Sequence, residues 1–182
     1  VRAFTDGSGL EVHKTLFENN SDTAIWSGSG QLSGQPVVTD AGVIFAMDGS
    51  FHLVDASGNE SKLGGDSFGA MQAPLRSPNG SGIAFVAGDQ LILTASGQPS
   101  SGTALPYSAT GGGFAFSKSG SEIAVATDGT LAIYGSDGTT EGQVATGGNA
   151  TVIAWRSDGI VVLVNEKQPE LRLISPSDVK AG

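Results

Sequence analysis

Residue types that could support catalysis are scarce in this chain. Residues 65–69 read Gly-Asp-Ser-Phe-Gly, which matches the Gly-x-Ser-x-Gly motif that places a nucleophilic serine between a strand and a helix in hydrolases. No helical pattern follows the motif here, and the chain offers just His13 and His52 as bases. In a chain this rich in glycine and serine, such a match is expected by chance. We therefore interpret residues 65–69 as a loop and predict that the chain has no catalytic residues and is not an enzyme.

Metal and phosphate sites are also poorly supported by the sequence. Two histidines and no cysteine cannot complete a transition-metal ligand set. Calcium would need several oxygen ligands at loop spacing, whereas each Asp-Gly turn here carries one carboxylate. Glycine clusters such as residues 111–113 lack the lysine and the helix start that a phosphate-binding loop requires. We predict no metal site and no cofactor, with a calcium ion held between loops of neighbouring repeats as the alternative.

Composition and charge restrict the class of partner. The chain has 182 residues, 28 of them glycine, and its 18 acidic and 9 basic residues give a net charge of −9. A nucleic-acid binder needs clustered lysine and arginine, and here the basic residues are scattered. No apolar run approaches the length that spans a membrane. We therefore expect neither a nucleic-acid partner nor a membrane span, and the absence of cysteine excludes disulfides.

Short apolar runs recur along the chain at nearly constant spacing. Four of them begin 40, 40 and 37 residues apart, at Val43, Ile83, Ile123 and Ile160. A second run follows each of these, beginning at Phe51, Leu91, Leu131 and Leu171. All are rich in β-branched and aromatic residues and are bounded by turn residues, which is typical of strands. With one run before each pair and a weaker outer run after it, each repeat indicates a four-stranded blade of a β-propeller. A β-sandwich is the alternative, although it does not require the same pattern at constant spacing.

Two of the repeats carry a distinctive turn-and-strand motif. Residues 75–86 read Leu-Arg-Ser-Pro-Asn-Gly-Ser-Gly-Ile-Ala-Phe-Val, and residues 116–125 read Phe-Ser-Lys-Ser-Gly-Ser-Glu-Ile-Ala-Val. These segments resemble the repeats of the TolB-like, WD-like family of bacterial β-propellers, and the likeness extends over residues 37–175. Two further repeats, with turns at residues 39–42 and 156–159, match in part, and no Trp-Asp pair closes any repeat. The resemblance implies a propeller in an extracellular or cell-envelope setting of a bacterium, such as that of an actinobacterial-type envelope lipoprotein.

The two ends of the chain fit the repeat incompletely. Residues 1–17 read like the third and fourth strands of a blade, and residues 18–35 form a polar, Gly/Ser-rich stretch that is an inserted loop or strand. We therefore expect residues 1–35 to hold a partial blade and an irregular stretch. Residues 36–182 are expected to hold three complete blades and one partial blade, followed by a helical turn capped at Ser177. The fold class predicted is all-β: a propeller segment of about four four-stranded antiparallel blades, with an incomplete ring that a second chain or further blades would complete.

The sequence places function in loops that rigid blades hold in position. Candidate partner contacts are two tryptophans and three loop aspartates, namely Trp26, Trp155, Asp66, Asp137 and Asp158. Exposed tryptophan is a frequent binding anchor, although the default role of Trp155 is packing between blades. We predict a non-catalytic binding or scaffold module that has a protein partner or associates with itself. The alternatives are an accessory propeller of a larger peptidase-type enzyme and a self-assembling surface or filament subunit.

Overall fold

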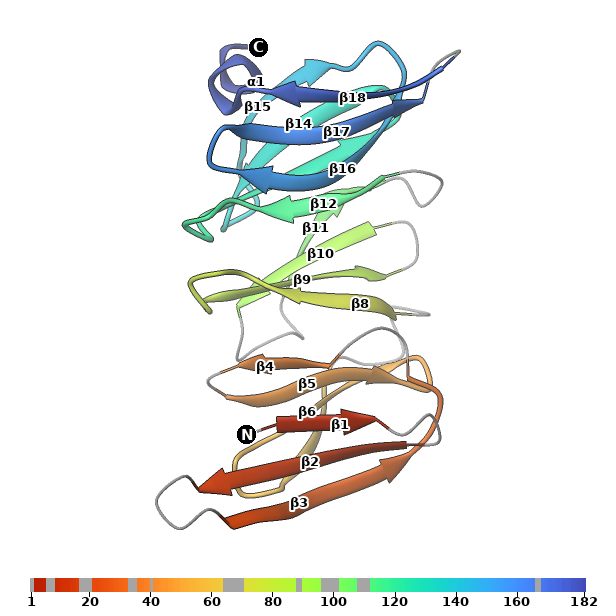
Figure 1. Ribbon diagram of the computed structural model, residues 1–182, viewed down its shortest axis with the longest axis vertical. Coiled ribbons are helices and arrows are strands. Elements are labelled where there is room, and N and C mark those ends of the chain that lie inside the picture. Colours follow the sequence, from red (N-terminus) through yellow and green to blue (C-terminus); the bar gives the residue numbers. More distant parts are fainter. Residues whose placement is uncertain are drawn as a thin grey trace. The chain divides into compact units, whose positions relative to one another are not determined.

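The protein is built from antiparallel β-sheets, as a computed structural model shows (Figure 1). It describes residues 2–5, 9–16, 21–32, 36–39, 41–63, 71–87, 90–95, 102–107, 112–165 and 168–182. In this part of the chain the strands form five sheets, three with four strands and two with three. In each sheet the strands lie in sequence order, so every connection within a sheet joins neighbouring strands. The prediction of an all-β fold with four-stranded antiparallel blades is confirmed.

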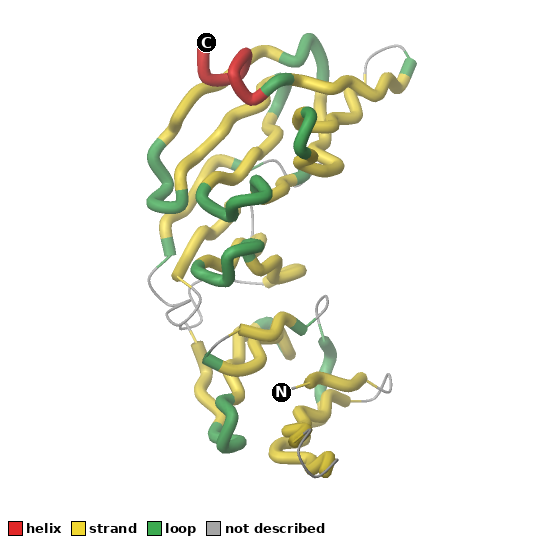
Figure 2. The backbone as a smooth tube through the Cα atoms, turned by 60° about the vertical axis from the view of Figure 1, so that its left-hand side comes forward, coloured by secondary structure: helices red, strands yellow, loops and turns green. Residues whose placement is uncertain are grey.

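The chain divides into two compact units, which are described separately. Unit 1 comprises Val1–Arg76, Ile83–Gly88 and Thr94–Gly102, and unit 2 comprises Ser77–Gly82, Asp89–Leu93 and Thr103–Gly182. The sheet with the order β11-β10-β9-β8 contributes strands to both units. Its strands are β8 (Met71–Arg76), β9 (Gly82–Ala87), β10 (Gln90–Ala95) and β11 (Thr103–Pro106). Strands and turns dominate the described residues of both units (Figure 2).

Unit 1 begins with a three-stranded sheet and continues with a four-stranded one. The first sheet consists of β1 (Arg2–Thr5), β2 (Gly9–Leu16) and β3 (Ser21–Ser29). The second consists of β4 (Val37–Thr39), β5 (Gly42–Met47), β6 (Ser50–Val54) and β7 (Glu60–Leu63). β3 occupies much of the Gly/Ser-rich stretch for which a loop and a strand were alternatives. It is a strand because it pairs with β2 along its whole length, with a bulge next to Val12.

The core of unit 1 forms between these two sheets. Because side chains alternate between the faces of a strand, Leu10 and Val12 of β2 share one face. They pack against Val43 and Phe45 of β5, and all four side chains are at most 1% exposed. Burial of these apolar side chains stabilises the contact between the sheets by the hydrophobic effect.

Unit 2 ends in two further sheets that pack on each other. One consists of β12 (Phe114–Phe116), β13 (Glu122–Thr127), β14 (Thr130–Gly135) and β15 (Thr140–Ala145). The other consists of β16 (Asn149–Arg156), β17 (Gly159–Asn165) and β18 (Pro169–Ile174). Leu131 and Ile133 of β14 pack in one cluster with Ile160 and Val162 of β17, and none of these side chains is exposed. The repeat of apolar runs in the sequence therefore corresponds to sheets that stack through their faces.

A short helix, α1 (Pro176–Ala181), follows β18. Its N-cap is Ser175, whose side chain accepts a hydrogen bond from the Ser177 backbone N–H, so the predicted cap at Ser177 is wrong by two residues. Pro176 explains the shift, because proline is favoured in the first helical turn and needs no N–H partner there. The Val179 side chain is buried in the core cluster of unit 2, which anchors α1 against β14 and β15.

Candidate functional site

Four polar turns belong to unit 2, and we call them together the turn surface (residues 77–82, 117–122, 135–139 and 156–159). In the first turn the Asn79 Oδ1 atom accepts hydrogen bonds from the Ser77 hydroxyl at 2.8 Å, the Ser81 hydroxyl at 2.7 Å and the Ser81 backbone N–H at 3.0 Å. The Ser77 hydroxyl oxygen in turn accepts from the Gly82 N–H at 2.8 Å. These bonds hold the exposed side chains of Asn79 and Ser81 in defined positions.

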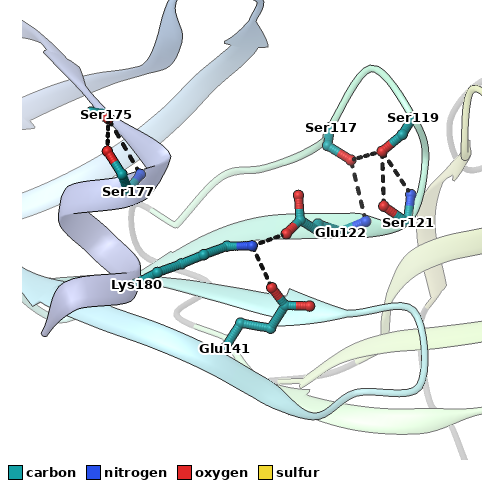
Figure 3. A network of polar contacts seen from close by, with 8 residues as sticks. All are labelled: Ser117, Ser119, Ser121, Glu122, Glu141, Ser175, Ser177 and Lys180. Carbon is teal, nitrogen blue, oxygen red and sulfur yellow. Dashed lines mark hydrogen bonds and ion pairs between the residues drawn. The ribbon is translucent and has the colours of Figure 1, made fainter.

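The second turn repeats this arrangement with hydroxyl groups. The oxygens of Ser117 and Ser119 lie 3.0 Å apart, and those of Ser119 and Ser121 lie 2.8 Å apart (Figure 3). The Ser117 hydroxyl oxygen also accepts a bond from the Glu122 N–H at 3.2 Å. Ser119 and Ser121 are exposed, so this row of hydroxyls is open to a ligand that can donate or accept hydrogen bonds.

The turns of unit 2 contact one another. Gly120 has a φ of +73°, and a Cβ atom at this position would lie 2.7 Å from the side chain of Asn79. A larger residue would therefore be strained and would push the two turns apart. The Ser136 N–H donates to the Ser121 carbonyl at 2.9 Å, which joins the third turn to the second. The turn surface is thus continuous across these three turns.

Two of the aspartates predicted as contacts lie on the turn surface. The Asp137 carboxylate accepts a hydrogen bond from the Thr139 N–H at 2.9 Å, and this bond lowers the pKa of Asp137 below its ordinary value. Asp158 forms an exposed ion pair with Arg156, with 3.1 Å between the Arg156 Nε and Asp158 Oδ1 atoms. Because β12 and β16 run in the same direction in Figure 1, the turns that follow them lie at the same end of their sheets. Both carboxylates are exposed.

A lysine of α1 joins the helix to the sheet beside the turn surface. The Lys180 ammonium group contacts the carboxylate of Glu122, at the start of β13, and lies 2.6 Å from the Glu141 Oε2 atom of β15 (Figure 3). The hydrogen bond to Glu122 is the main cause of a raised pKa at Lys180. The bond from Lys180 lowers the pKa of Glu141. Lys180 therefore compensates the charges of two carboxylates and adds a polar contact to the burial of Val179.

Trp26 takes part in a polar and aromatic network within unit 1. Its Nε1 donates to Glu60 Oε2 at 2.9 Å, and the His52 Nδ1 atom lies 2.6 Å from the other oxygen of that carboxylate. The rings of Trp26 and His52 both lie beside Phe45, with centroids 5.1 Å and 5.3 Å from it. The network connects β3 with β5, β6 and β7. The Trp26 indole is partly buried and its N–H is hydrogen-bonded, so Trp26 contributes to the packing of unit 1.

The other predicted site residues lie elsewhere. Trp155 is partly buried against the core cluster of unit 2 and does not join the turn surface. Asp66 and the Gly-x-Ser-x-Gly match at residues 65–69 lie outside the described residues. His13 lies on the face of β2, where its two ring nitrogens meet different carboxylates, Glu11 at 3.0 Å and Asp22 at 3.1 Å. The bond to Glu11 is the main cause of a raised pKa at His13.

The described part of the chain shows neither a metal-binding cluster nor a membrane-spanning helix. No group of three or more His, Asp or Glu side chains there is arranged to hold a metal ion. His13 illustrates the reason, because its two carboxylate partners lie at opposite ring nitrogens and do not converge on one point. None of the helices found in these residues has the length and apolar character that crossing a bilayer requires.

Sequence reasoning missed the partners that fix these side chains. The pairing of Trp26 with Glu60 joins residues 34 positions apart, and that of Lys180 with Glu122 joins residues 58 positions apart. In neither pair does the spacing of nearby residues in the sequence indicate the partner. The contact between the Ser77 and Ser117 turns had a signal, since both turns begin the repeat motif and stacked repeats bring equivalent turns together.

Comparison with known proteins supports the fold. No family model matches the chain, and no curated protein matches it. The WD40 domain of Neurospora crassa Pan2 has a TM-score of 0.53 at 15% identity, covering 82% of this chain and 48% of that one. The Myceliophteria thermophila Cps50 (Swd1) β-propeller domain has a TM-score of 0.52 at 15% identity, covering 75% of this chain and 49% of that one. KlHsv2 with loop 6CD replaced by a Gly-Ser linker has a TM-score of 0.56 at 12% identity, covering 95% of this chain and 67% of that one.

These likenesses concern the fold alone, because the sequence identities are low. The chain spans about half the length of the first two propeller domains that it matches. The WD-like part of the resemblance drawn from the sequence is supported by these neighbours, whereas the TolB-like part stays a prediction. The sheets of this chain are blades of the β-propeller type found in WD40 domains.

Proposed function

We propose that the chain is a non-catalytic protein-interaction module that binds a peptide segment of a partner through its turn surface. The observation that carries this proposal is the contact between turns of successive sheets, which brings exposed hydroxyl, amide and carboxylate groups together in hydrogen-bonded positions. Groups that are already ordered lose little conformational entropy on binding. Loops held by a rigid scaffold are favourable binding sites for the same reason. The likeness to WD40 propeller domains supports a scaffold role without naming the partner.

The hydroxyl groups of this surface favour binding over catalysis. A serine nucleophile needs a general base within hydrogen-bond reach. The Ser117, Ser119 and Ser121 hydroxyls bond to one another and to backbone N–H groups. His13 and His52 belong to unit 1, where their ring nitrogens bond to carboxylates. Recognition would therefore rest on shape and on hydrogen bonds.

Two aspartates at opposite ends of the blades allow a controlled test of the binding surface. Asp158 lies on the turn surface, between β16 and β17, whereas Asp128 lies in the turn between β13 and β14. Because connections in an antiparallel sheet alternate between its ends, the turn at Asp128 is at the end away from residues 117–122. Both aspartates are exposed and precede a glycine, so replacing either one by arginine changes the net charge equally.

The experiment selects binders for the whole chain from a displayed library of random peptides and measures their affinities by calorimetry. Asp158→Arg is expected to weaken binding at least about tenfold, a loss of about 1.4 kcal/mol. Asp128→Arg should leave the affinity unchanged. Circular dichroism would establish that both variants are folded. Failure to select any peptide, or equal affinities for the wild type and Asp158→Arg, would contradict the proposal.

A further inference from the structure

One face of the sheet β16-β17-β18 is apolar and exposed. Leu171 and Leu173 of β18 are 66% and 55% exposed, although both are large hydrophobic residues. In the strand register they stand opposite Leu163 and Val161 of β17, which are partly exposed. Residues directly opposite each other in paired strands project from the same face of the sheet. We call Val161, Leu163, Leu171 and Leu173 the apolar face.

The equivalent face of the neighbouring sheet is covered by a second sheet. In the repeat, the apolar face corresponds to four residues of β13 and β14. These are Ala124, Ala126, Leu131 and Ile133. All four are 0% exposed, because the sheet β16-β17-β18 packs on them with Ile160, Val162 and Val164. The apolar face is thus equivalent to a surface that a second β-sheet buries one repeat earlier.

The four residues of the apolar face are uncharged. Most residues that share this face in the register at its margins are polar or small, namely Asn149, Thr151, Ala154, Asn165 and Pro169. The exception is Arg156, which stands opposite Gly159 and forms an ion pair with Asp158. The chain as a whole has a net charge of −9, so two copies repel each other over most of their surfaces. Contact through an uncharged apolar face avoids this repulsion and gains the burial of exposed leucines.

The first sheet of the chain does not offer a matching partner surface. The face of β2 and β3 turned away from Leu10 and Val12 carries His13 with its carboxylate partners Glu11 and Asp22. Packing the apolar face against these groups would bury charges without new partners, which is costly. A head-to-tail assembly of copies through these two faces is therefore disfavoured. An isologous contact, in which the same face meets itself, needs no second surface.

We propose that the apolar face of β16, β17 and β18 is a self-association surface at which a second copy of this chain binds face to face across a two-fold axis. The two sheets pack as in a β-sandwich, with Leu171 and Leu173 of each copy interdigitating with the same face of the other. The turn surface consists of other residues, so dimerisation and peptide binding can fail independently.

The mass of the whole chain in solution tests this inference. Light scattering coupled to size exclusion is expected to give twice 18.3 kDa for the wild type. Leu171→Lys combined with Leu173→Lys should weaken dimerisation by more than about a hundredfold, because like charges would face each other across the interface. Val38→Lys combined with Leu75→Lys is the matched control, since both side chains are 41% exposed and belong to unit 1. A monomeric wild type, or a dimer that persists in the Leu171→Lys and Leu173→Lys variant, would overturn the proposal.

Disulfide trapping tests the symmetry of the contact. The chain has no cysteine, so a single introduced cysteine can bond just to its counterpart in another copy. Under mild oxidation, Leu163→Cys or Leu171→Cys should give covalent dimers, because an isologous interface brings equivalent residues near the axis together. Leu75→Cys is the control and should stay monomeric under denaturing conditions. A dimer that neither cysteine of the apolar face can trap would show that another surface mediates association.

Discussion

Lys180 shows how one cation can connect a terminal helix to a sheet. Its ammonium group bonds to the carboxylates of Glu122 and Glu141, which belong to different strands. The pKa of Glu141 is lowered by Lys180, so its contribution to the free energy of unfolding is lost as the pH falls through that lowered pKa. The pKa of Lys180 is raised by Glu122, so its contribution is lost as the pH rises through that raised value. Both contributions are present from about pH 5 to about pH 10.

Lys180→Met should therefore destabilise the protein in this pH range and not in acid. The expected loss is about 0.5 kcal/mol at neutral pH, because the groups are partly exposed and screened by solvent. Urea denaturation from pH 7 down to pH 3 would follow the difference from the wild type, which should vanish as Glu141 is protonated. Lys118→Met replaces an exposed lysine in the 117–122 turn and should change the stability little at either pH. A pH-independent loss in Lys180→Met would show that the ion pairs do not contribute.

The network around Trp26 is a second case at this scale in which partners decide a residue's role. The sequence predicted Trp26 as a contact residue because of its type and its polar surroundings. Its N–H is bonded to Glu60, and its ring lies beside Phe45. Those partners belong to strands of the next sheet, so they depend on the stacking of the sheets and leave no mark on the spacing of nearby residues.

Among the elements, α1 depends on a glycine in the strand below it. A Cβ atom at Gly142 of β15 would lie 2.4 Å from the Val179 carbonyl oxygen and 2.5 Å from the Lys180 Cα atom. Gly142→Ala should therefore displace α1 and reduce the free energy of unfolding by about 1 to 3 kcal/mol. Gln143→Ala alters the adjacent, exposed position of the same strand and serves as the control. Equal denaturation midpoints for both variants would mean that α1 does not pack tightly on β15.

The strands that follow the sequence repeat were predictable from the sequence, whereas β3, which lies outside the repeat, was less predictable. Runs such as residues 123–126 and 131–134 became β13 and β14 because apolar and β-branched residues between Asp-Gly and Ser-Gly turns fit a sheet that is buried on both faces. β3 has a weak apolar pattern, and its pairing with β2 is what orders it. The cap of α1 carried a usable signal, since Ser175-Pro176 has proline in its favoured place after an N-cap serine.

At the scale of the whole molecule, the fold favours a scaffold role and does not specify the partner. The blades stack through apolar faces and leave connecting turns exposed, so the surfaces proposed for recognition and for self-association lie on different parts of the blades. The turn surface could be predicted as a set of Asp, Asn, Ser and Gly turns, and Asp137 and Asp158 were chosen for that reason. The contact between the turns at Asn79 and Gly120 comes from the stacking of successive sheets, which brings equivalent turns of the repeat together.

The proposed function places the partner on the turn surface. Amide NMR spectra of the isotope-labelled chain, recorded with and without a selected peptide, would test it most directly. We predict that the largest shift changes fall on residues 77–82, 117–122, 135–139 and 156–159. Residues 127–130, at the other end of the sheet β12-β13-β14-β15, should change little. Changes concentrated at residues 127–130, or on the apolar face of β17 and β18, would contradict the claim.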